Sequence, residues 1–488
     1  MIKPYSNMNF EMIRYIISNI MRIEAYLMTV PLAISLYLKE DSAKGFVISI
    51  FILILLSFFL SRKNPTKTEF YAKEGMIMVS LAWVILSLFG SLPFYISREI
   101  PIFIDAFFET VSGFTTTGAT ILNDIESMSK GLLFWRSLTH WIGGMGVLVF
   151  AMAVLPQQND NGMYIMKAEV PGHSVGKLVA KASYTARILY GIYIFLTVVE
   201  IVLLLAGDMS LYDSCIHAMS TGGTGGFSCR NASVAYYDSA YIDTVISVFM
   251  VLFGINFNLY YFILIGELKN FYKSEELRTY LGIIFVATAL IVLNIYPQIG
   301  SVSHAIRLAF FQVSSIITTT GFITADYTKW PLFSQGILML IMFIGAMSGS
   351  TGGGIKVSRA VIATKKAFVE LKRTVHPKRI KSINFEGKPI NDGVIDAIFG
   401  YLWLYILIYL ISCMLLLFQN FDMLSVFGAV TTCINNVGPG LGICNPVSNF
   451  AEFDFVSKIV LSFDMLAGRL EIFPMVALFM PFMWRKRG

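Results

Sequence analysis

Long apolar runs constrain this chain more than any other feature. Residues 45–60 (GFVISIFILILLSFFL) and 401–418 (YLWLYILIYLISCMLLLF) approach or reach the length of about 20 residues that a helix needs to cross a bilayer core. Only 14% of the residues are charged and the mean hydropathy is +0.68, whereas soluble domains carry about a quarter of charged residues. The sequence therefore predicts an all-α polytopic membrane protein and argues strongly against a soluble enzyme.

The apolar runs predict ten full spans: 16–38, 46–61, 76–96, 132–155, 188–206, 242–266, 280–297, 332–371 (interrupted), 392–418 and 457–484. An even number of spans places both termini on one side. The connections on that side include ten Lys or Arg within residues 356–388, while the opposite connections hold six basic and eleven acidic residues. Because basic connections stay cytoplasmic, we expect cytoplasmic termini. The net charge of +6 then follows from topology, with no reason to expect nucleic acid.

Four segments of equal length align without gaps and end on a glycine. They are DAFFETVSGFTTTG (105–118), DSCIHAMSTGGTGG (213–226), LAFFQVSSIITTTG (308–321) and SVFGAVTTCINNVG (425–438). Their final glycines lie 108, 95 and 117 residues apart, and each segment falls between two predicted spans on the outer side. Internal repeats of this kind decide the fold. They divide the chain into a two-span prefix and four units of span, short helix, glycine turn and span: 1–70, then 71–183, 184–275, 276–388 and 389–488.

A polar glycine turn between two spans needs a physical reason. Irregular backbone at membrane depth is tolerated only where protein buries it or where it lines a watery cavity, and a helix of about ten residues must enter the bilayer and return. Four such turns around one axis supply carbonyl oxygens that can replace the hydration shell of a cation. Glycine permits the positive φ that aims successive carbonyls inward. We therefore predict a central pore, with a non-pore repeat transporter as the alternative.

Three further motifs accompany the four segments: FWRSLTHWIGGMGVLVF (134–150), MSGSTGGGIKVSR (347–359) and MLAGRLEIFP (465–474). Together they resemble the Trk/Ktr/HKT superfamily of potassium transporters, and the two-span prefix is similar to that of its TrkH/TrkG-type membrane subunits. The resemblance implies four M1–P–M2 repeats around one pore, a homodimer, and potassium uptake across the cytoplasmic (inner) membrane of a prokaryote. It also implies gating by a cytoplasmic ring of TrkA-like nucleotide-binding proteins.

The nucleotide is expected on that partner, and no cofactor is expected on this chain. The string GSTGGGIK resembles a phosphate loop, but it lacks both the preceding strand and the GxxxxGK[ST] pattern. The chain also shows no paired-carboxylate or Ser/His constellation, so an enzyme is disfavoured. The competing function is a secondary transporter that couples K⁺ to H⁺ or Na⁺. An ionisable residue facing the pore would favour coupling, and the glycine segments place none at the filter.

The resemblance, carried over residue by residue, assigns sixteen positions to the potassium selectivity filter. They are Thr116, Thr117, Gly118, Ala119, Thr224, Gly225, Gly226, Phe227, Thr319, Thr320, Gly321, Phe322, Asn436, Val437, Gly438 and Pro439. The four strings differ, and Pro439 stands where the others have Ala or Phe. Unlike turns should coordinate an ion less uniformly than four identical ones, so modest selectivity for potassium over sodium is expected. The register of the second string is ambiguous by one residue, because TGGTGG allows two alignments.

The run SGSTGGGIK (348–356) interrupts the second span of the third unit, because so many glycine and hydroxyl residues cannot hold a lipid-facing helix. In the family it corresponds to an intramembrane loop that obstructs the pore and moves on gating. The alternative is a kink that permits close helix packing. The residues that the resemblance assigns to this gate are Gly349, Ser350, Thr351, Gly352, Gly353, Gly354 and Lys356.

Arg469 lies midway along the last predicted span, where an unpaired charge is costly. Its side chain should therefore face a cavity or a carboxylate, and Asp464 is the nearest candidate. In the family the matching arginine projects into the pore beneath the filter, where a positive charge raises the barrier to a cation. Both the pore role and a structural ion pair with Asp464 remain open, and so does the role of Asp464 itself.

Several remaining features carry weaker expectations. The basic segments 357–388 and 156–187 are candidates for docking the cytoplasmic partner, with ordinary positive-inside bias and lipid headgroup contact as the alternative. Cys229 and Cys444 fall in predicted outer loops and could pair there, but we expect them to be unpaired. The five histidines, at positions 140, 173, 217, 304 and 376, show no ligand spacing. We therefore expect no metal site other than K⁺ at the filter.

Overall fold

The computed structural model describes residues 8–66, 71–146, 182–376 and 382–484. Within these ranges the chain is almost entirely helical, and the only sheet is a small hairpin that pairs Asn384 with Pro389 and Phe385 with Lys388. The prefix consists of α1 (Phe10–Leu27), α2 (Thr29–Leu38) and α3 (Ser42–Ser61). The first unit contains α4 (Ala72–Gly90), α5 (Leu92–Ile96), α6 (Phe103–Phe114) and α7 (Lys130–Gly144).

The later units follow the same order of a long helix, a short helix and a second helix. The second contains α10 (Ala182–Ala206), α11 (Leu211–Gly223), the 3₁₀ turn η1 (Ser233–Tyr237), α12 (Ala240–Phe253), α13 (Phe257–Leu264) and α14 (Leu268–Lys273). The third contains α15 (Glu275–Ile299), α16 (Val302–Ile317), η2 (Tyr327–Lys329), α17 (Leu332–Ile344) and α18 (Val357–Val375). The last contains β1 (Asn384–Phe385), β2 (Lys388–Pro389), α19 (Asp392–Leu417), α20 (Met423–Asn435), η3 (Gly442–Cys444), α21 (Phe455–Arg469), α22 (Phe473–Phe479) and α23 (Pro481–Trp484).

Six stretches of the described chain are long and apolar enough to cross a membrane. They are Phe10–Leu38, Ser42–Ser61, Ala72–Ile96, Thr185–Ala206, Glu275–Ile299 and Asp392–Leu417. They correspond to the two predicted prefix spans and to the predicted first span of each unit. These spans confirm the expected multi-pass, helical membrane protein.

The second spans of the second and fourth units depart from the prediction. The chain bends by 92° between α12 and α13, and α21 ends at Arg469 before Glu471 and Ile472 take positive φ values of 55° and 66°. The prediction of continuous helices over 242–266 and 457–484 was therefore wrong. The predicted interruption of 332–371 is confirmed, as a break between α17 and α18. α7 ends at Gly144, and the rest of the predicted span 132–155 lies mainly outside the described residues.

The break after α12 is stabilised by a segment that lies far away in the sequence. The carbonyl of Gly254 accepts a hydrogen bond from the backbone N–H of Met347 at 3.2 Å, and the Phe253 carbonyl accepts one from the Thr351 hydroxyl at 3.2 Å. A helix end leaves such carbonyls without helical partners. Here the segment between α17 and α18 supplies the donors, so a third-unit loop ends a second-unit helix.

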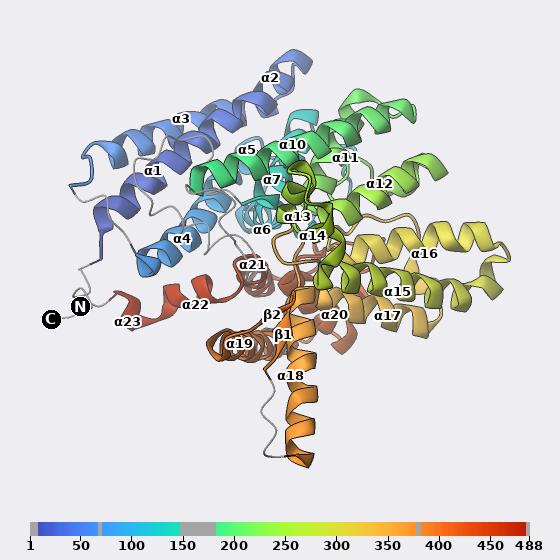
Figure 1. The fold of residues 1–488 in the computed structure, drawn as a ribbon. Coiled ribbons are helices and arrows are strands. Elements are labelled where there is room, and N and C mark those ends of the chain that lie inside the picture. Colours follow the sequence, from blue (N-terminus) through green and yellow to red (C-terminus); the bar gives the residue numbers. More distant parts are fainter. Residues whose placement is uncertain (1–7, 67–70, 147–181, 377–381, 485–488) are drawn as a thin grey trace, which may run out of the picture.

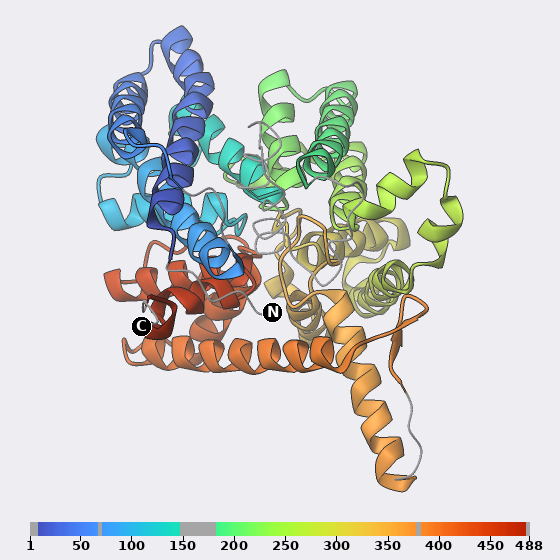
Figure 2. The same cartoon turned by 60° about the vertical axis from the view of Figure 1, so that its left-hand side comes forward.

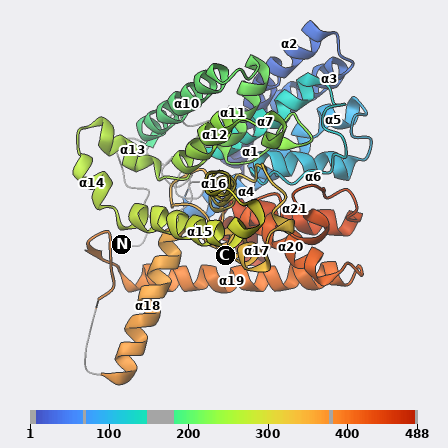
Figure 3. The same cartoon turned by 90° about the vertical axis from the view of Figure 1, so that its right-hand side faces the viewer.

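The second helix of each unit packs on the short helix of the next. α7 contacts α11, α12 contacts α16, α17 contacts α20, and α21 returns to α6. The helices of the four units therefore surround the loops in the middle of Figure 2. The prefix helices α1–α3 pack outside this arrangement, against α4, α5 and α7 (Figures 2 and 3). α18 extends away from the other helices (Figure 1).

Candidate functional site: four glycine turns and the segment beneath them

The short helices α6, α11, α16 and α20 each end in the same backbone conformation. Two residues before the final glycine of each segment, a non-glycine residue adopts a left-handed φ: 55° at Thr116, 55° at Thr224, 60° at Thr319 and 56° at Asn436. The glycines themselves have φ values of 79° at Gly118, 73° at Gly226, 84° at Gly321 and 90° at Gly438. The second segment therefore adopts this backbone with Gly226 equivalent to Gly118. We call residues 116–119, 224–227, 319–322 and 436–439 the first to fourth glycine turns.

The four glycine turns contact one another in cyclic order. A Cβ atom placed on the final glycine of any turn would lie within 3.0 Å of a backbone carbonyl oxygen of the next, closer than real Cβ atoms come. The carbonyls met in this way belong to Gly225, Thr320, Val437 and Thr117, starting from Gly118. Each carbonyl belongs to the residue before a final glycine, and the fourth contact returns to the first turn. The turns thus form a closed ring that any side chain at these glycines would disrupt.

Buried hydroxyl and amide groups support the ring without introducing charge. The Thr115 and Thr117 hydroxyls are 2.8 Å apart, and the Thr318 and Thr320 hydroxyls are 2.7 Å apart. The Asn436 amide donates to the Thr117 hydroxyl at 3.0 Å, which links the fourth turn to the first. These bonds support the first, third and fourth turns on the side away from the ring.

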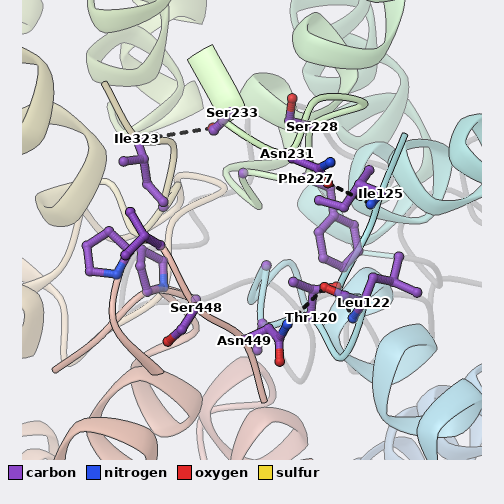
Figure 4. A pocket seen from close by; sticks show the side chains of 18 of the residues that line it. Thr120, Leu122, Ile125, Phe227, Ser228, Asn231, Ser233, Ile323, Ser448 and Asn449 are labelled. Atoms are coloured by element: carbon purple, nitrogen blue, oxygen red, sulfur yellow. Dashed lines mark hydrogen bonds between the residues drawn. The ribbon is translucent and has the colours of Figure 1, made fainter. Parts of the chain in front are cut away.

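A cavity of about 180 Å³ opens above the ring and is lined by all four glycines together with the connections that follow the turns. Figure 4 shows the labelled side chains around this cavity. The connections are tied to one another by Asn231, which accepts from the N–H of Ile125 at 2.7 Å, and by Asn449, which donates to the Leu122 carbonyl at 3.1 Å. The hydrogen bond from Asn231 also lowers the pKa of Asp124.

The predicted gate residues lie on the other side of the ring. The backbone N–H of Gly353 donates to the Thr319 hydroxyl at 2.6 Å. A Cβ on Gly352 or Gly353 would fall within 3.0 Å of the carbonyl of Thr318 or Asn435, respectively. The segment Gly345–Lys356, which we call the inner loop, is therefore pressed against the third and fourth turns. Its glycines are required by this close approach.

The inner loop is anchored to α17 and to α15. It folds back on α17, where the N–H groups of Ile355 and Lys356 donate to the carbonyls of Phe343 and Ile344 at 3.1 and 2.9 Å. Its start and the start of α18 are held by a carboxylate oxygen of Glu276 on α15. That oxygen accepts from the N–H of Ser348 at 2.7 Å and from that of Ser358 at 3.1 Å.

Arg469 joins the inner loop to the first unit. The guanidinium is only 5% exposed, and it donates to the carbonyl of Thr351 at 2.6 Å and to those of Gly143 and Gly144 at 2.5 Å each. Asp464 instead accepts from the Ser412 hydroxyl at 2.7 Å. The described residues show no ion pair between Asp464 and Arg469, so that expected alternative was wrong. Helix α21 turns the two side chains toward different neighbours.

A family model described as a cation transport protein of the TrkH type matches residues 42–486. The chain belongs to the TrkH family. It is 36% identical to the Trk system potassium uptake protein TrkH of Escherichia coli K12 over 485 residues, which cover 98% of this chain and 100% of that protein. It is 33% identical to TrkG of the same organism over 466 residues, or 93% and 94% of the two chains. These relatives are named as uptake proteins and not as enzymes.

The solved structures give the same result. The crystal structure of the potassium transporter TrkH from Vibrio parahaemolyticus matches with a TM-score of 0.88 and 33% identity, covering 98% of this chain and 100% of that one. The resemblance deduced from the sequence motifs is thereby confirmed over nearly the whole chain.

The structure of this TrkH-family chain also bears on the predictions for its cysteines, for a metal site and for segment 156–187. Cys229 and Cys444 are buried free thiols, in agreement with the expectation that they are unpaired. The described residues contain no group of three or more His, Cys, Asp or Glu suited to a metal ion. Segment 156–187 lies mostly outside the described residues.

Sequence reasoning missed two ion pairs near the ring and the inner loop. Glu109 and Arg136 form an ion pair at 2.5 Å, with side chains 0% and 2% exposed, and Glu471 pairs with Arg359. Glu471 follows the end of α21 at Arg469, within the span that was predicted over 457–484. For the first pair the signal was available, since DAFFETVSGF and FWRSLTHW each carry a charge within an apolar segment.

Proposed function

We propose that this chain takes up K⁺ through a pore formed by four M1–P–M2 repeats, with the sixteen residues of the glycine turns as its selectivity filter. The observation that carries this proposal is the closed cyclic contact of the four turns. Each turn presents to the ring the carbonyl before its glycine, and rings of carbonyls replace the hydration shell of a potassium ion. The potassium transport named for the similar proteins supports the same conclusion.

The ring suits a cation for two further reasons. The C-terminal ends of α6, α11, α16 and α20 lead into the turns, and these ends carry partial negative charge. No turn residue is ionisable. The residues after the glycines are Ala119, Phe227, Phe322 and Pro439, so the backbone beyond the ring differs from turn to turn. We therefore expect preference for K⁺ over Na⁺ that is modest compared with a filter of four identical turns.

The inner loop and Arg469 form the proposed gate. The loop covers the inner side of the ring at the third and fourth turns, and the Arg469 guanidinium spans from the loop to α7. A cation that leaves the ring inward meets both an obstruction and a positive charge. Opening therefore requires the loop to give up its bonds to Thr319, Glu276 and Arg469.

The device that moves the loop is proposed to be a TrkA-like ring on the cytoplasmic side, which would carry the nucleotide. The inner loop continues directly into α18, a basic helix that extends from the body of the protein (Figure 1). Helix α18 and the hairpin at 384–389 are thus available for docking. We further propose a homodimer with one pore per protomer in a prokaryotic inner membrane, with both termini in the cytoplasm.

The test is K⁺ flux in liposomes that contain the purified protein. A partner-gated conduit carries K⁺ down its own gradient, and imposing a proton or Na⁺ gradient leaves the flux at a fixed membrane potential unchanged. The alternative, a transporter that couples K⁺ to H⁺ or Na⁺, requires that gradient to drive K⁺ uphill. Uphill K⁺ accumulation that collapses with the H⁺ or Na⁺ gradient would overturn the conduit. Absence of any K⁺ flux would overturn the proposed function as a whole.

A further inference from the structure

The residue nine positions before each final glycine lies on the short helix and differs in every unit. These residues are Glu109, His217, Gln312 and Ala429. In the first three units this side chain contacts the extended segment that directly follows the glycine turn. A ring nitrogen of His217 lies 3.0 Å from the Ser228 hydroxyl, and the Gln312 amide contacts Thr324 at 3.4 Å. Alanine has no polar group for this purpose, so the four turns are supported unequally.

Glu109 makes the strongest of these supports. One carboxylate oxygen accepts from the Thr120 hydroxyl at 3.0 Å and the other from the N–H of Ile121 at 2.9 Å. Thr120 and Ile121 directly follow the first glycine turn. The first oxygen also accepts from Arg136 Nε on α7 at 2.5 Å. The carboxylate thus holds the exit strand of the first turn at two points.

Arg136 extends this support to the second turn. Its guanidinium donates to the carbonyl of Ser228 at 3.2 Å and lies 3.5 Å from the centre of the Phe227 ring. Phe227 directly follows Gly226, and its other neighbour in this stack is His140, with ring centres 4.0 Å apart. One buried ion pair therefore holds the segments that follow both the first and the second glycine turn.

A buried ion pair of this kind is not explained by its contribution to folding stability. The desolvation of two buried charges cancels much of their attraction, and apolar residues of similar volume are often as stable. What the pair adds is geometry, because charge-assisted hydrogen bonds are short and directional. An ion smaller than K⁺ binds well only if the carbonyl ring contracts. The hydrogen bonds from Glu109 and Arg136 to the segments behind the ring oppose this contraction.

We propose that Glu109 and Arg136 are positioning residues for ion selectivity, which hold the first and second turns apart and thereby favour K⁺ over Na⁺. This inference rests on the proposed function of the glycine turns as the filter. The two residues do not touch the ion. They act through Thr120, Ile121, Phe227 and Ser228.

The test uses three variants of the full-length protein in liposomes. Glu109→Gln retains the volume and removes the charge, Arg136→Lys retains the charge but loses the planar contact with Phe227, and Thr120→Val removes one hydroxyl donor. Glu74→Gln and Arg22→Lys are matched controls. Glu74 is buried at the start of α4 and caps Tyr71, while Arg22 binds Ser57 on α3.

The measured quantity is the ratio of K⁺ to Na⁺ permeability, together with total K⁺ flux and the thermal unfolding midpoint. We expect Glu109→Gln and Arg136→Lys to lower the ratio by about tenfold, the effect of losing one charge-assisted hydrogen bond, and Thr120→Val to lower it less. The controls should keep the wild-type ratio. Thr120→Val leaves the ion pair intact. It can therefore be tested as a folded protein even if Glu109→Gln or Arg136→Lys folds poorly.

Two results would overturn the inference. The first is that folded variants keep the wild-type ratio of K⁺ to Na⁺ permeability. This includes variants whose unfolding midpoint falls, because the ion pair would then contribute only to stability. The other is an equal fall of the ratio in the controls. Wild-type protein without K⁺ flux would instead refute the proposed function. Wild-type flux with unaffected variants refutes only the role of the ion pair.

Discussion

The glycine turns and the inner loop lie next to each other, and both consist of irregular buried backbone, but side-chain hydrogen bonds have a larger share in holding the loop. In the turns, backbone meets backbone so closely that a single Cβ would not fit. The inner loop also approaches the third and fourth turns closely, but side chains add hydrogen bonds that hold it: Glu276 on α15, Arg469 on α21 and the Thr319 hydroxyl.

This difference separates a fixed part from a movable part. Steric contacts between backbones can be relieved only by rebuilding the ring. Hydrogen bonds, in contrast, contribute only about 1 kcal/mol each in net terms and can be exchanged for others. The inner loop can therefore change position while the turns keep theirs. The predictions below test this contrast, from the largest expected effect to the smallest.

Gly118→Ala should have the largest effect. The added Cβ meets the carbonyl of Gly225, and the residue has a φ of 79°. We expect K⁺ uptake to fall by about a hundredfold or more, because a clash and a left-handed backbone each cost about 1–3 kcal/mol. Uptake is measured in cells that lack other K⁺ transporters. Gly191→Ala on α10 is the control, since nothing lies within 4 Å of its Cβ position. Normal uptake by Gly118→Ala would show that the ring is not fixed.

Shortening the inner loop should have the opposite effect. Deleting residues 349–354 removes the segment that covers the third and fourth turns, so K⁺ flux without the cytoplasmic partner should rise by about tenfold or more as the obstructed state loses its advantage. The measurement is flux per folded protein in liposomes, with yield and elution profile as checks. Flux that stays at the wild-type level in well-folded protein would count against a gate and favour a loop that serves only helix packing.

Arg469→Ala should raise flux less, by about fivefold, because it removes one tether and one positive charge but leaves the loop in place. Arg469→Lys separates the two contributions. Lysine keeps the charge but cannot span from Thr351 to both Gly143 and Gly144. If charge dominates, the lysine variant remains as slow as wild type; if the tether dominates, it matches the alanine variant. Markedly lower flux in Arg469→Ala, at normal expression, opposes both roles.

The sequence was sufficient for much of this molecule, and the reasons are physical. Apolar runs identify unbroken spans because a helix in lipid must satisfy its own backbone, and all six such spans were predicted. The glycine segments were found because a left-handed φ at close quarters admits glycine alone. Both signals are local, so a single stretch of chain contains them.

The missed features depend on contacts between distant segments. α12 ends at Phe253, where Gly254 and the α13 N-cap Asn256 follow, but Met347 and Thr351, which donate to the last carbonyls, come from a distant segment. Asp464 was a reasonable partner for Arg469 by sequence distance alone, yet Ser412 on α19 takes its hydrogen bond. Pairings among buried polar groups follow from the packing of helices, which a single sequence does not specify. Which turn follows which in the ring is likewise a tertiary property.

Glu276 gives the mildest test of the movable part. A single carboxylate oxygen accepts the N–H groups of Ser348 and Ser358, at the start of the inner loop and of α18. Glu276→Gln keeps an oxygen in the same position and should leave flux close to wild type. Glu276→Ala leaves both N–H groups without this partner, which destabilises the obstructed state. Basal flux in liposomes should then rise about twofold, since the other anchors remain. If glutamine and alanine raise flux equally, the charge of Glu276 and not its hydrogen bonds restrains the loop; if neither does, the loop is held by sterics after all, and the contrast with the glycine turns disappears.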